Sequence, residues 1–436
     1  MKVPLLALGL ATVFCANLMA GETLNLNLVP ERGYLLRGSP GEVVVKIDLS
    51  AGADHHKARR TPLNLGVVLD RSGSMTGAKL AKAKQAARML VDRLRPDDFF
   101  SFVIFSDEAR VVVPAQRVED PEALKEKIER VEAEGSTALY AGVKLGAGQV
   151  AEFFSSRRIN RVILLSDGIA NVGPSSPQEL RRLGGQLAER GISVTTIGVG
   201  EDYNEDVMAG LAEASDANYY YVQDTEKLPQ IFARELGGLL AVVVRDVRIE
   251  VVCPEGVEPL GFIGRPEKFE HQRAVVNLSQ FLPGQARALF LRCRVNRDQP
   301  EVARVNVQYT DELGGGGAQT ASAGARVDFT DDPDRAEHSL NGSVYAEKEL
   351  VLTAVAKDEA LAQADAGHYA AAARILAAQD AVLNRAYGSA SPAAQARIRA
   401  ETNYLGDFTG QLDGGAYDGN LRKVMQEQSF NARNAK

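Results

Sequence analysis

The chain has 436 residues, 45% of them hydrophobic, and a formal net charge of −7 at pH 7. A chain of this length exceeds one ordinary hydrophobic core, so two or three globular domains are expected. The acidic balance argues against nucleic acid as a partner, because such binding depends on clustered Lys and Arg side chains that neutralise phosphates.

The first residues have the layout of a secretory signal peptide, expected to span 1–20. Lys2 precedes an apolar run from Pro4 to Phe14, and small residues then lead to Ala20, the expected cleavage point. The run is shorter than the roughly 20 apolar residues of a membrane-spanning helix. We therefore expect an exported protein, periplasmic or extracellular, with no transmembrane segment in the mature chain.

The pattern of apolar residues changes near residue 62. Before it, apolar and polar residues alternate at 24–28 and 43–49, which predicts half-buried strands. From Leu63 to Leu69 the run is almost continuously apolar, as in a strand covered on both faces.

Residues 62–242 form a regular succession of apolar runs and helical patterns. Further apolar runs lie at 99–105, 161–165, 192–199 and 219–222. Helical patterns lie near 77–94, 120–132, 138–156, 176–190, 204–214 and 225–240. This alternation predicts one α/β domain with a doubly wound, mostly parallel sheet.

Period-two alternation returns after residue 242 and continues to about Phe329. We expect residues 21–61 and 243–330 to form one β-sandwich, with the α/β domain inserted between its two halves. Cys253 and Cys293 alternate with polar residues on two of these strands, and an oxidising compartment favours a disulfide between them over two buried thiols.

The last hundred residues are rich in alanine and predict helices near 343–365, 368–387 and 392–411. Gly367 and Gly388 are typical helix ends, and Ser391-Pro392 is typical of a helix start. We expect a C-terminal helical segment over 343–412 and a flexible tail over 413–436.

Three short polar motifs carry the candidate chemistry. An Asp-x-Ser-x-Ser motif at 70–74 follows the first apolar run, Gly-Ser-Thr occupies 135–137, and Ser-Asp-Gly occupies 166–168. By itself, the first motif is equally typical of a turn that caps a helix. In the strand order 3-2-1-4-5-6, however, the first and fourth strands are neighbours, so Asp70 and Asp167 are expected to face each other at the switch point.

The oxygen atoms of these motifs are hard ligands, which select Mg²⁺, Mn²⁺ or Ca²⁺ over softer metals. The negative charges of two carboxylates only just balance the charge of a divalent cation, and the hydroxyl groups add no charge. Such an ion is expected to attract one more anionic ligand, an Asp or Glu carboxylate from a protein partner.

Together the three motifs resemble the metal-ion-dependent adhesion site (MIDAS) of von Willebrand factor type A (VWA) domains. The resemblance covers about 62–242 and implies that Asp70, Ser72, Ser74, Thr137 and Asp167 bind Mg²⁺, or else Mn²⁺ or Ca²⁺. It implies cell adhesion or assembly through a carboxylate of the partner. The insertion into a sandwich is similar to exported bacterial proteins that resemble inter-alpha-trypsin inhibitor heavy chains.

Two other functions compete with this interpretation. A metal-dependent hydrolase needs a general base, yet no such residue is evident near the motifs, and all five histidines lie far from them in sequence: His55, His56, His271, His338 and His368. A structural assembly subunit with a non-functional metal site is the other alternative, against which the complete ligand set argues. We expect no catalytic residue, and a binding protein in place of an enzyme.

Overall fold

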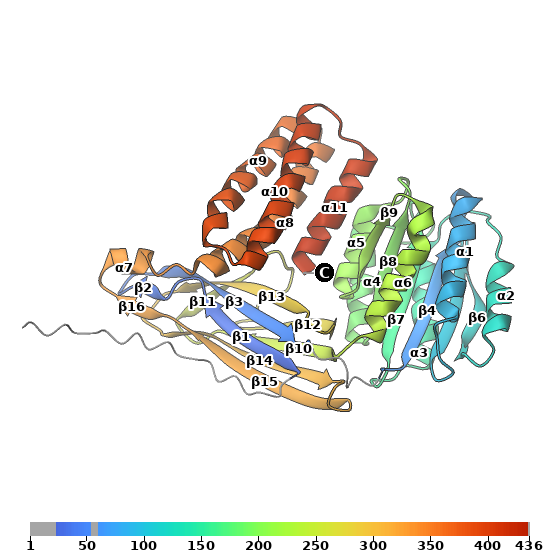
Figure 1. The fold of residues 1–436 in the computed structure, drawn as a ribbon, viewed down its shortest axis with the longest axis horizontal. Coiled ribbons are helices and arrows are strands. Elements are labelled where there is room, and N and C mark those ends of the chain that lie inside the picture. The colour runs from blue at the N-terminus through green and yellow to red at the C-terminus, as the bar shows by residue number, and fades with distance from the viewer. Residues whose placement is uncertain (1–22, 54–59, 435–436) are drawn as a thin grey trace, which may run out of the picture.

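The computed structural model describes residues 23–53 and 60–434. The expected signal peptide, Cys15 and the pair His55-His56 lie outside these residues. Figure 1 shows three parts: an α/β domain, a β-sandwich beside it, and a group of C-terminal helices that contacts both. This arrangement confirms the predicted fold class.

The α/β domain is built on a six-stranded sheet of order β6-β5-β4-β7-β8-β9. Its strands are β4 (Leu63–Asp70), β5 (Phe99–Phe105), β6 (Ala109–Arg117), β7 (Ile159–Ser166), β8 (Ser193–Val199) and β9 (Tyr219–Val222). All neighbouring strands of this sheet pair in parallel except β5 and β6, which pair antiparallel. β4 lies beside β7 with Leu69 opposite Leu165, so the two strands end at the same edge of the sheet.

Strand β6 has no counterpart among the strands predicted from apolar runs. It is an edge strand with Pro114 in its interior, and only Val113 of its residues is buried. A proline and a mostly accessible surface are both features of edge strands, and they remove the continuous apolar run that marks the central strands. With β6 present, β7 is the fourth strand in chain order, as the predicted strand order requires.

Helices cover both faces of this sheet (Figure 1). They are α1 (Ala78–Val91), α2 (Pro121–Glu129), α3 (Leu139–Glu152), α4 (Pro177–Glu189), α5 (Glu205–Ala214) and α6 (Leu228–Leu240). α1, α2 and α6 contribute to one apolar core, and α3, α4 and α5 to the core on the opposite face. α3 approaches β4 closely because glycines face it: a Cβ at Gly66 would lie 2.9 Å from Cγ2 of Val150.

The sandwich consists of two four-stranded sheets, β1-β3-β13-β11 and β12-β10-β14-β15. Their strands are β1 (Leu24–Pro30), β3 (Gly41–Ala51), β10 (Val244–Val252), β11 (Val257–Phe262), β12 (Arg273–Phe281), β13 (Ala286–Val295), β14 (Glu301–Asp311) and β15 (Gly317–Arg326), and a parallel pair joins β2 (Tyr34–Leu36) to β16 (Asp328–Thr330). β3 pairs with β13 along its length, so strands on either side of the α/β domain in sequence share one sheet. Alternate residues of both sheets meet in one apolar core.

Cys253 and Cys293 face each other across this core as free thiols. Their Sγ atoms lie 3.9 Å apart, and both side chains are buried. The expected disulfide is therefore not present in the structure. The two cysteines pack as small apolar side chains among the Val and Leu residues of the sandwich.

The C-terminal part is a bundle that follows the short helix α7 (Pro333–Glu337). Its helices are α8 (Gly342–Asp365), α9 (Tyr369–Ala386), α10 (Pro392–Asp413) and α11 (Gly419–Asn434). None of the helices within the described residues is both long and apolar enough to cross a membrane.

Helix α11 corrects the expectation of a flexible tail over 413–436. It packs between α8 and α5, and its residue Phe430 is fully buried in the core of the α/β domain. Nζ of Lys423, itself buried, lies 3.0 Å from Oε2 of Glu205 in α5. The tail was mispredicted because α11 is polar overall and is held by residues far away in the sequence.

Candidate metal centre

The loop after β4 places the first set of oxygen atoms. Asp70 is the last residue of β4, and its Oδ1 accepts a 2.8 Å hydrogen bond from the backbone N–H of Ser72. A short 3-10 turn, η1 (Gly73–Met75), follows and brings the hydroxyl groups of Ser72 and Ser74 to 3.1 Å from each other. One carboxylate and two hydroxyls thus share one side of the loop.

The Gly-Ser-Thr loop lies against this first loop. The backbone N–H of Gly73 donates a 3.0 Å hydrogen bond to the carbonyl of Gly135. Gly135 has φ +77°, and a Cβ there would lie 2.5 Å from Oδ2 of Asp107, so only glycine fits. The N–H of Thr137 donates to Oδ1 of Asn171 at 2.9 Å, which fixes the threonine at the start of α3.

The Ser-Asp-Gly loop after β7 completes the cluster. The hydroxyl of Ser166 donates to Oδ2 of Asp70, and the hydroxyl of Ser74 donates to Oδ1 of Asp167 at 2.7 Å. A Cβ on Gly168 would lie 2.9 Å from Oγ1 of Thr137 and 3.7 Å from Oδ2 of Asp70. All five predicted residues, Asp70, Ser72, Ser74, Thr137 and Asp167, therefore lie in one cluster at the carboxyl edge of the sheet.

The two carboxylate side chains of this cluster are buried. Asp70 and Asp167 are both 0% exposed. Burial raises the pKa of Asp70 to about 6; the hydrogen bonds from Ser166 and Ser72 lower it, and the nearby Asp167 raises it further. Lys79, near the start of α1, pairs its ammonium group with Oδ2 of Asp167. A buried pair of carboxylates held by hydroxyl groups fits a divalent cation, which would relieve their mutual repulsion.

The side chains of this cluster favour a hard divalent cation. No group of three or more His, Cys, Asp or Glu side chains able to hold a metal occurs among residues 23–53 and 60–434. The five predicted side chains offer carboxylate and hydroxyl oxygens, which suit Mg²⁺, Mn²⁺ and Ca²⁺.

Four residues that support the cluster were not among the predicted ligands, although Ser166 belongs to the Ser-Asp-Gly motif. Ser166 bonds to Asp70, Asn171 holds the backbone of Thr137, Asp107 accepts a 2.9 Å hydrogen bond from the N–H of Ser136, and Lys79 pairs with Asp167. Asp107 could have been found, because it lies two residues beyond the end of β5 at the same edge of the sheet. The roles of the other three depend on loop conformation and carry no spacing signal.

Comparison with known proteins agrees with the fold of the α/β domain. Residues 64–234 match the model of the von Willebrand factor type A domain. An uncharacterized protein of Synechocystis sp. is 30% identical over 307 residues, which cover 67% of this chain and 72% of that protein. The inter-alpha-trypsin inhibitor heavy chain H3 of Homo sapiens is 27% identical over 164 residues, covering 35% of this chain and 18% of the heavy chain.

A von Willebrand factor type A structure from Catenulispora acidiphila has the same fold over most of its length. Its TM-score is 0.70 at 20% identity, covering 89% of this chain and 90% of that chain. A doubly wound sheet with carboxylate and hydroxyl side chains gathered at its switch point defines the class of α/β domain to which this part of the chain belongs. The chain belongs to the von Willebrand factor type A domain family.

Proposed function

We propose that this protein is an exported protein-binding protein whose VWA domain acts through a MIDAS. In this proposal Asp70, Ser72, Ser74, Thr137 and Asp167 hold Mg²⁺, or else Mn²⁺ or Ca²⁺, and a protein partner supplies an Asp or Glu carboxylate. The function is adhesion or assembly. Export to the periplasm or the cell exterior is part of the proposal and is supported by the layout of residues 1–20.

One observation carries the metal site: Asp70 and Asp167, 97 residues apart in sequence, are connected through hydroxyl groups of the facing loops. Such a buried pair is costly unless positive charge compensates it, and Lys79, which pairs with Asp167, supplies only one positive charge for the two carboxylates. Two carboxylates and neutral hydroxyls leave a divalent ion with little excess negative charge around it. A carboxylate from outside the chain is therefore its natural further ligand.

Binding is favoured over catalysis by the surroundings of the crevice. The three histidines among the described residues lie in the sandwich, beside α7 and in the helical bundle, and none lies in the α/β domain. Ser74 hydrogen bonds to Ser72 and donates to Oδ1 of Asp167, and no histidine lies in the described part of the α/β domain to activate either serine as a nucleophile. We propose a binding role without a catalytic residue.

The metal site is tested by titrating Mg²⁺ and Mn²⁺ into the purified protein and measuring the heat. We expect one site per chain in the wild type and none in Asp70→Ala or Asp167→Ala. Identical binding by the wild type and both variants would show that the cation lies elsewhere.

The partner site is tested by affinity capture from the native source in Mg²⁺ and in excess EDTA. Thr137→Ala removes one proposed ligand, and Thr76→Ala is its matched control because that exposed hydroxyl hydrogen bonds only to the carbonyl of Gly73 among the described residues, at 2.7 Å. We expect Thr137→Ala and EDTA to abolish capture and Thr76→Ala to leave it unchanged. Capture of the same partners in EDTA would assign binding to another surface, such as the C-terminal helices.

A further inference from the structure

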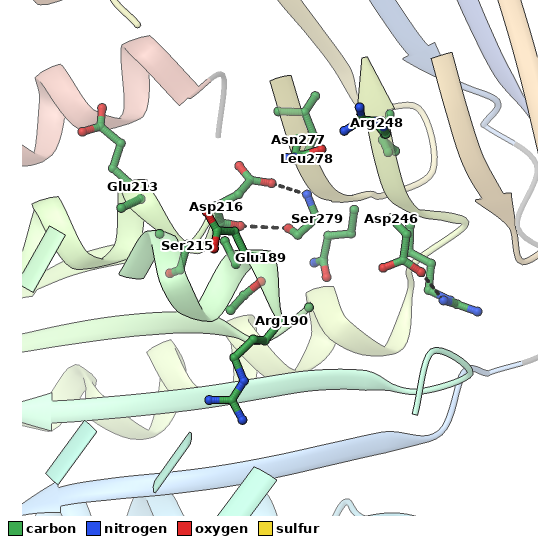
Figure 2. Close-up of a pocket in the computed structure, with 18 of the residues that line it drawn as sticks. Glu189, Arg190, Glu213, Ser215, Asp216, Asp246, Arg248, Asn277, Leu278 and Ser279 are labelled. Atoms are coloured by element: carbon green, nitrogen blue, oxygen red, sulfur yellow. Dashed lines mark hydrogen bonds and ion pairs between the residues drawn. The ribbon is translucent and has the colours of Figure 1, made fainter. Parts of the chain in front are cut away.

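A second site candidate lies at the opposite edge of the α/β sheet. A cavity of about 1010 Å³ opens between the starts of β7 and β8, the ends of α4 and α5, strands β10 and β12 of the sandwich, and the end of α11. Figure 2 shows Glu189 and Arg190 on the α/β side and Arg248 and Asn277 on the sandwich side. β7 separates this cavity from the metal centre by roughly 20 Å, the length of about six strand residues.

The lining of this junction cavity is cationic. It contains eight arginines against five Asp and Glu residues, in a chain whose net charge is −7. An excess of positive charge at one place in an acidic protein concentrates anions there. Helix α4 ends at this cavity, and its negative C-terminal end offsets part of the charge of Arg190.

Several of these arginines are neutralised by neighbouring carboxylates. Arg181 pairs with Glu213, Arg245 pairs with Asp246 and with Glu312, and Arg265 pairs with Glu267. These ion pairs explain why so many arginines gather between the domains, and they leave no free charge for a ligand.

Three other arginines of the lining make no ion pair with any described residue. They are Arg158, Arg190 and Arg248, and Glu189 is the lining carboxylate in the same situation. Arg158 is held in place by stacking, with its guanidinium 4.7 Å from the ring centroid of Phe99, and its buried Nε has no hydrogen-bond partner among the described residues. Arg190 and Arg248 are exposed. The uncompensated cations therefore outnumber the uncompensated anion.

We propose that the junction cavity binds a small polyanion that carries carboxylate or phosphate groups. A guanidinium group presents paired N–H donors that match both kinds of oxygen, which makes arginine the side chain suited to such ligands. The cavity volume matches small-molecule sites, which span about 300–1,000 Å³. Arg190 belongs to the α/β domain and Arg248 to the sandwich, so both domains contribute unpaired guanidinium groups to the lining.

The proposal is tested by calorimetry on the metal-free, full-length protein with citrate and pyrophosphate as separate probes, at ionic strength matched with NaCl. We expect saturable binding of at least one probe, and a loss of about tenfold in affinity for Arg190→Gln and for Arg248→Gln, since each removes one charge-assisted contact. Arg130→Gln is the matched control, because Arg130 is an exposed arginine directly after α2 and does not line the cavity.

Each outcome decides the matter. Binding of citrate but not pyrophosphate assigns a carboxylate ligand, and the reverse assigns a phosphate ligand. Absence of saturable heat with both probes overturns the proposal, as does equal affinity in the wild type, Arg190→Gln and Arg248→Gln. Both substituted side chains are exposed, and unchanged circular dichroism verifies that the variants fold. The metal centre takes no part in the test, so this result is independent of the proposed function.

Discussion

The ammonium group of Lys79 lies against Oδ2 of Asp167, the carboxylate whose other oxygen accepts the hydroxyl of Ser74 at 2.7 Å. The side chain of Asp167 is fully buried, whereas that of Lys79 is 26% exposed. A cation tethered to α1 therefore neutralises part of the charge of the crevice and lies on a proposed metal ligand.

Removing this tethered cation should strengthen metal binding. We expect Lys79→Gln to raise the affinity for Mg²⁺ about fivefold, because a partly exposed ion pair contributes up to ~1 kcal/mol that the metal no longer has to displace. Calorimetric titration measures the change. Lys82→Gln is the control, since Lys82 is also on α1 but pairs with Glu226. Equal affinities of Lys79→Gln and the wild type would show that Lys79 does not compete with the metal.

Metal affinity should fall as the solution is acidified. Burial raises the pKa of Asp70 to about 6 from an ordinary value of 3.8, so in the metal-free protein the carboxylate takes up a proton below about pH 6. The metal must displace this proton, which weakens binding by up to about tenfold per pH unit below the pKa. Titrations at pH 7.5, 6.5 and 5.5 measure the trend, and a pH-independent affinity would contradict it.

The same pKa shift has the opposite effect on stability without metal. Because the folded-state pKa of Asp70 lies above its unfolded value, ionisation of Asp70 destabilises the metal-free fold above about pH 6. Acidification from pH 7 to pH 5 reduces this penalty, which disappears fully only below the ordinary pKa of 3.8. We expect Asp70→Asn to raise the thermal midpoint of the metal-free protein at pH 7.5 and to have a smaller effect at pH 5. A larger effect at the lower pH would reverse the assigned sign.

Ile169 is the candidate for an apolar contact with the partner. It follows the Ser-Asp-Gly loop directly and is 61% exposed, the largest value among the exposed large apolar side chains of the described residues. Ile169→Ala should weaken partner binding about tenfold, as an apolar interface contact does, and leave Mg²⁺ affinity unchanged. Val111→Ala, on the edge strand β6 and 36% exposed, is the control. Unaltered capture of the partner by Ile169→Ala would place the interface elsewhere.

Helix α11 should be required for the stability of the α/β domain. Phe430 is 0% exposed, and its ring meets that of Tyr219 edge to face at a centroid distance of 5.7 Å. Phe430→Ala should lower the free energy of unfolding by about 3–5 kcal/mol, the usual range for a buried phenylalanine. Urea denaturation measures the loss, and Ile169→Ala should change stability by less than about 0.5 kcal/mol. Similar urea midpoints for both variants would mean that α11 does not stabilise the domain.

The candidate site could be predicted from sequence because its ligands follow strand ends. Asp70 is the last residue of β4, and Asp167 directly follows β7. Because these neighbouring strands are parallel, they end at the same edge of the sheet. The central strands could also be predicted from sequence, because β4 and β7 are buried at every residue and appear as nearly continuous apolar runs. Local periodicity and the rules of parallel sheets were sufficient for both.

The errors fell where local pattern and tertiary environment differ. β6 is an exposed edge strand with a proline, and α11 has only scattered apolar residues such as Leu421, Met425 and Phe430 on a polar helix. Both are stabilised by neighbours from other parts of the chain. Cys253 and Cys293 were correctly expected to face the sandwich core, but composition and compartment could not decide between a bond and two thiols.

Sequence alone thus determined the class of domain, the order of its central strands and the clustering of the carboxylate and hydroxyl side chains, because each depends on residue type and on spacing along the chain. Tertiary structure decided the pairing of Lys79 with Asp167, the docking of α11 and the cationic cavity between the α/β domain and the sandwich. These features arise where side chains distant in sequence are packed together, and the balance between ion pairing and desolvation there depends on their final separations.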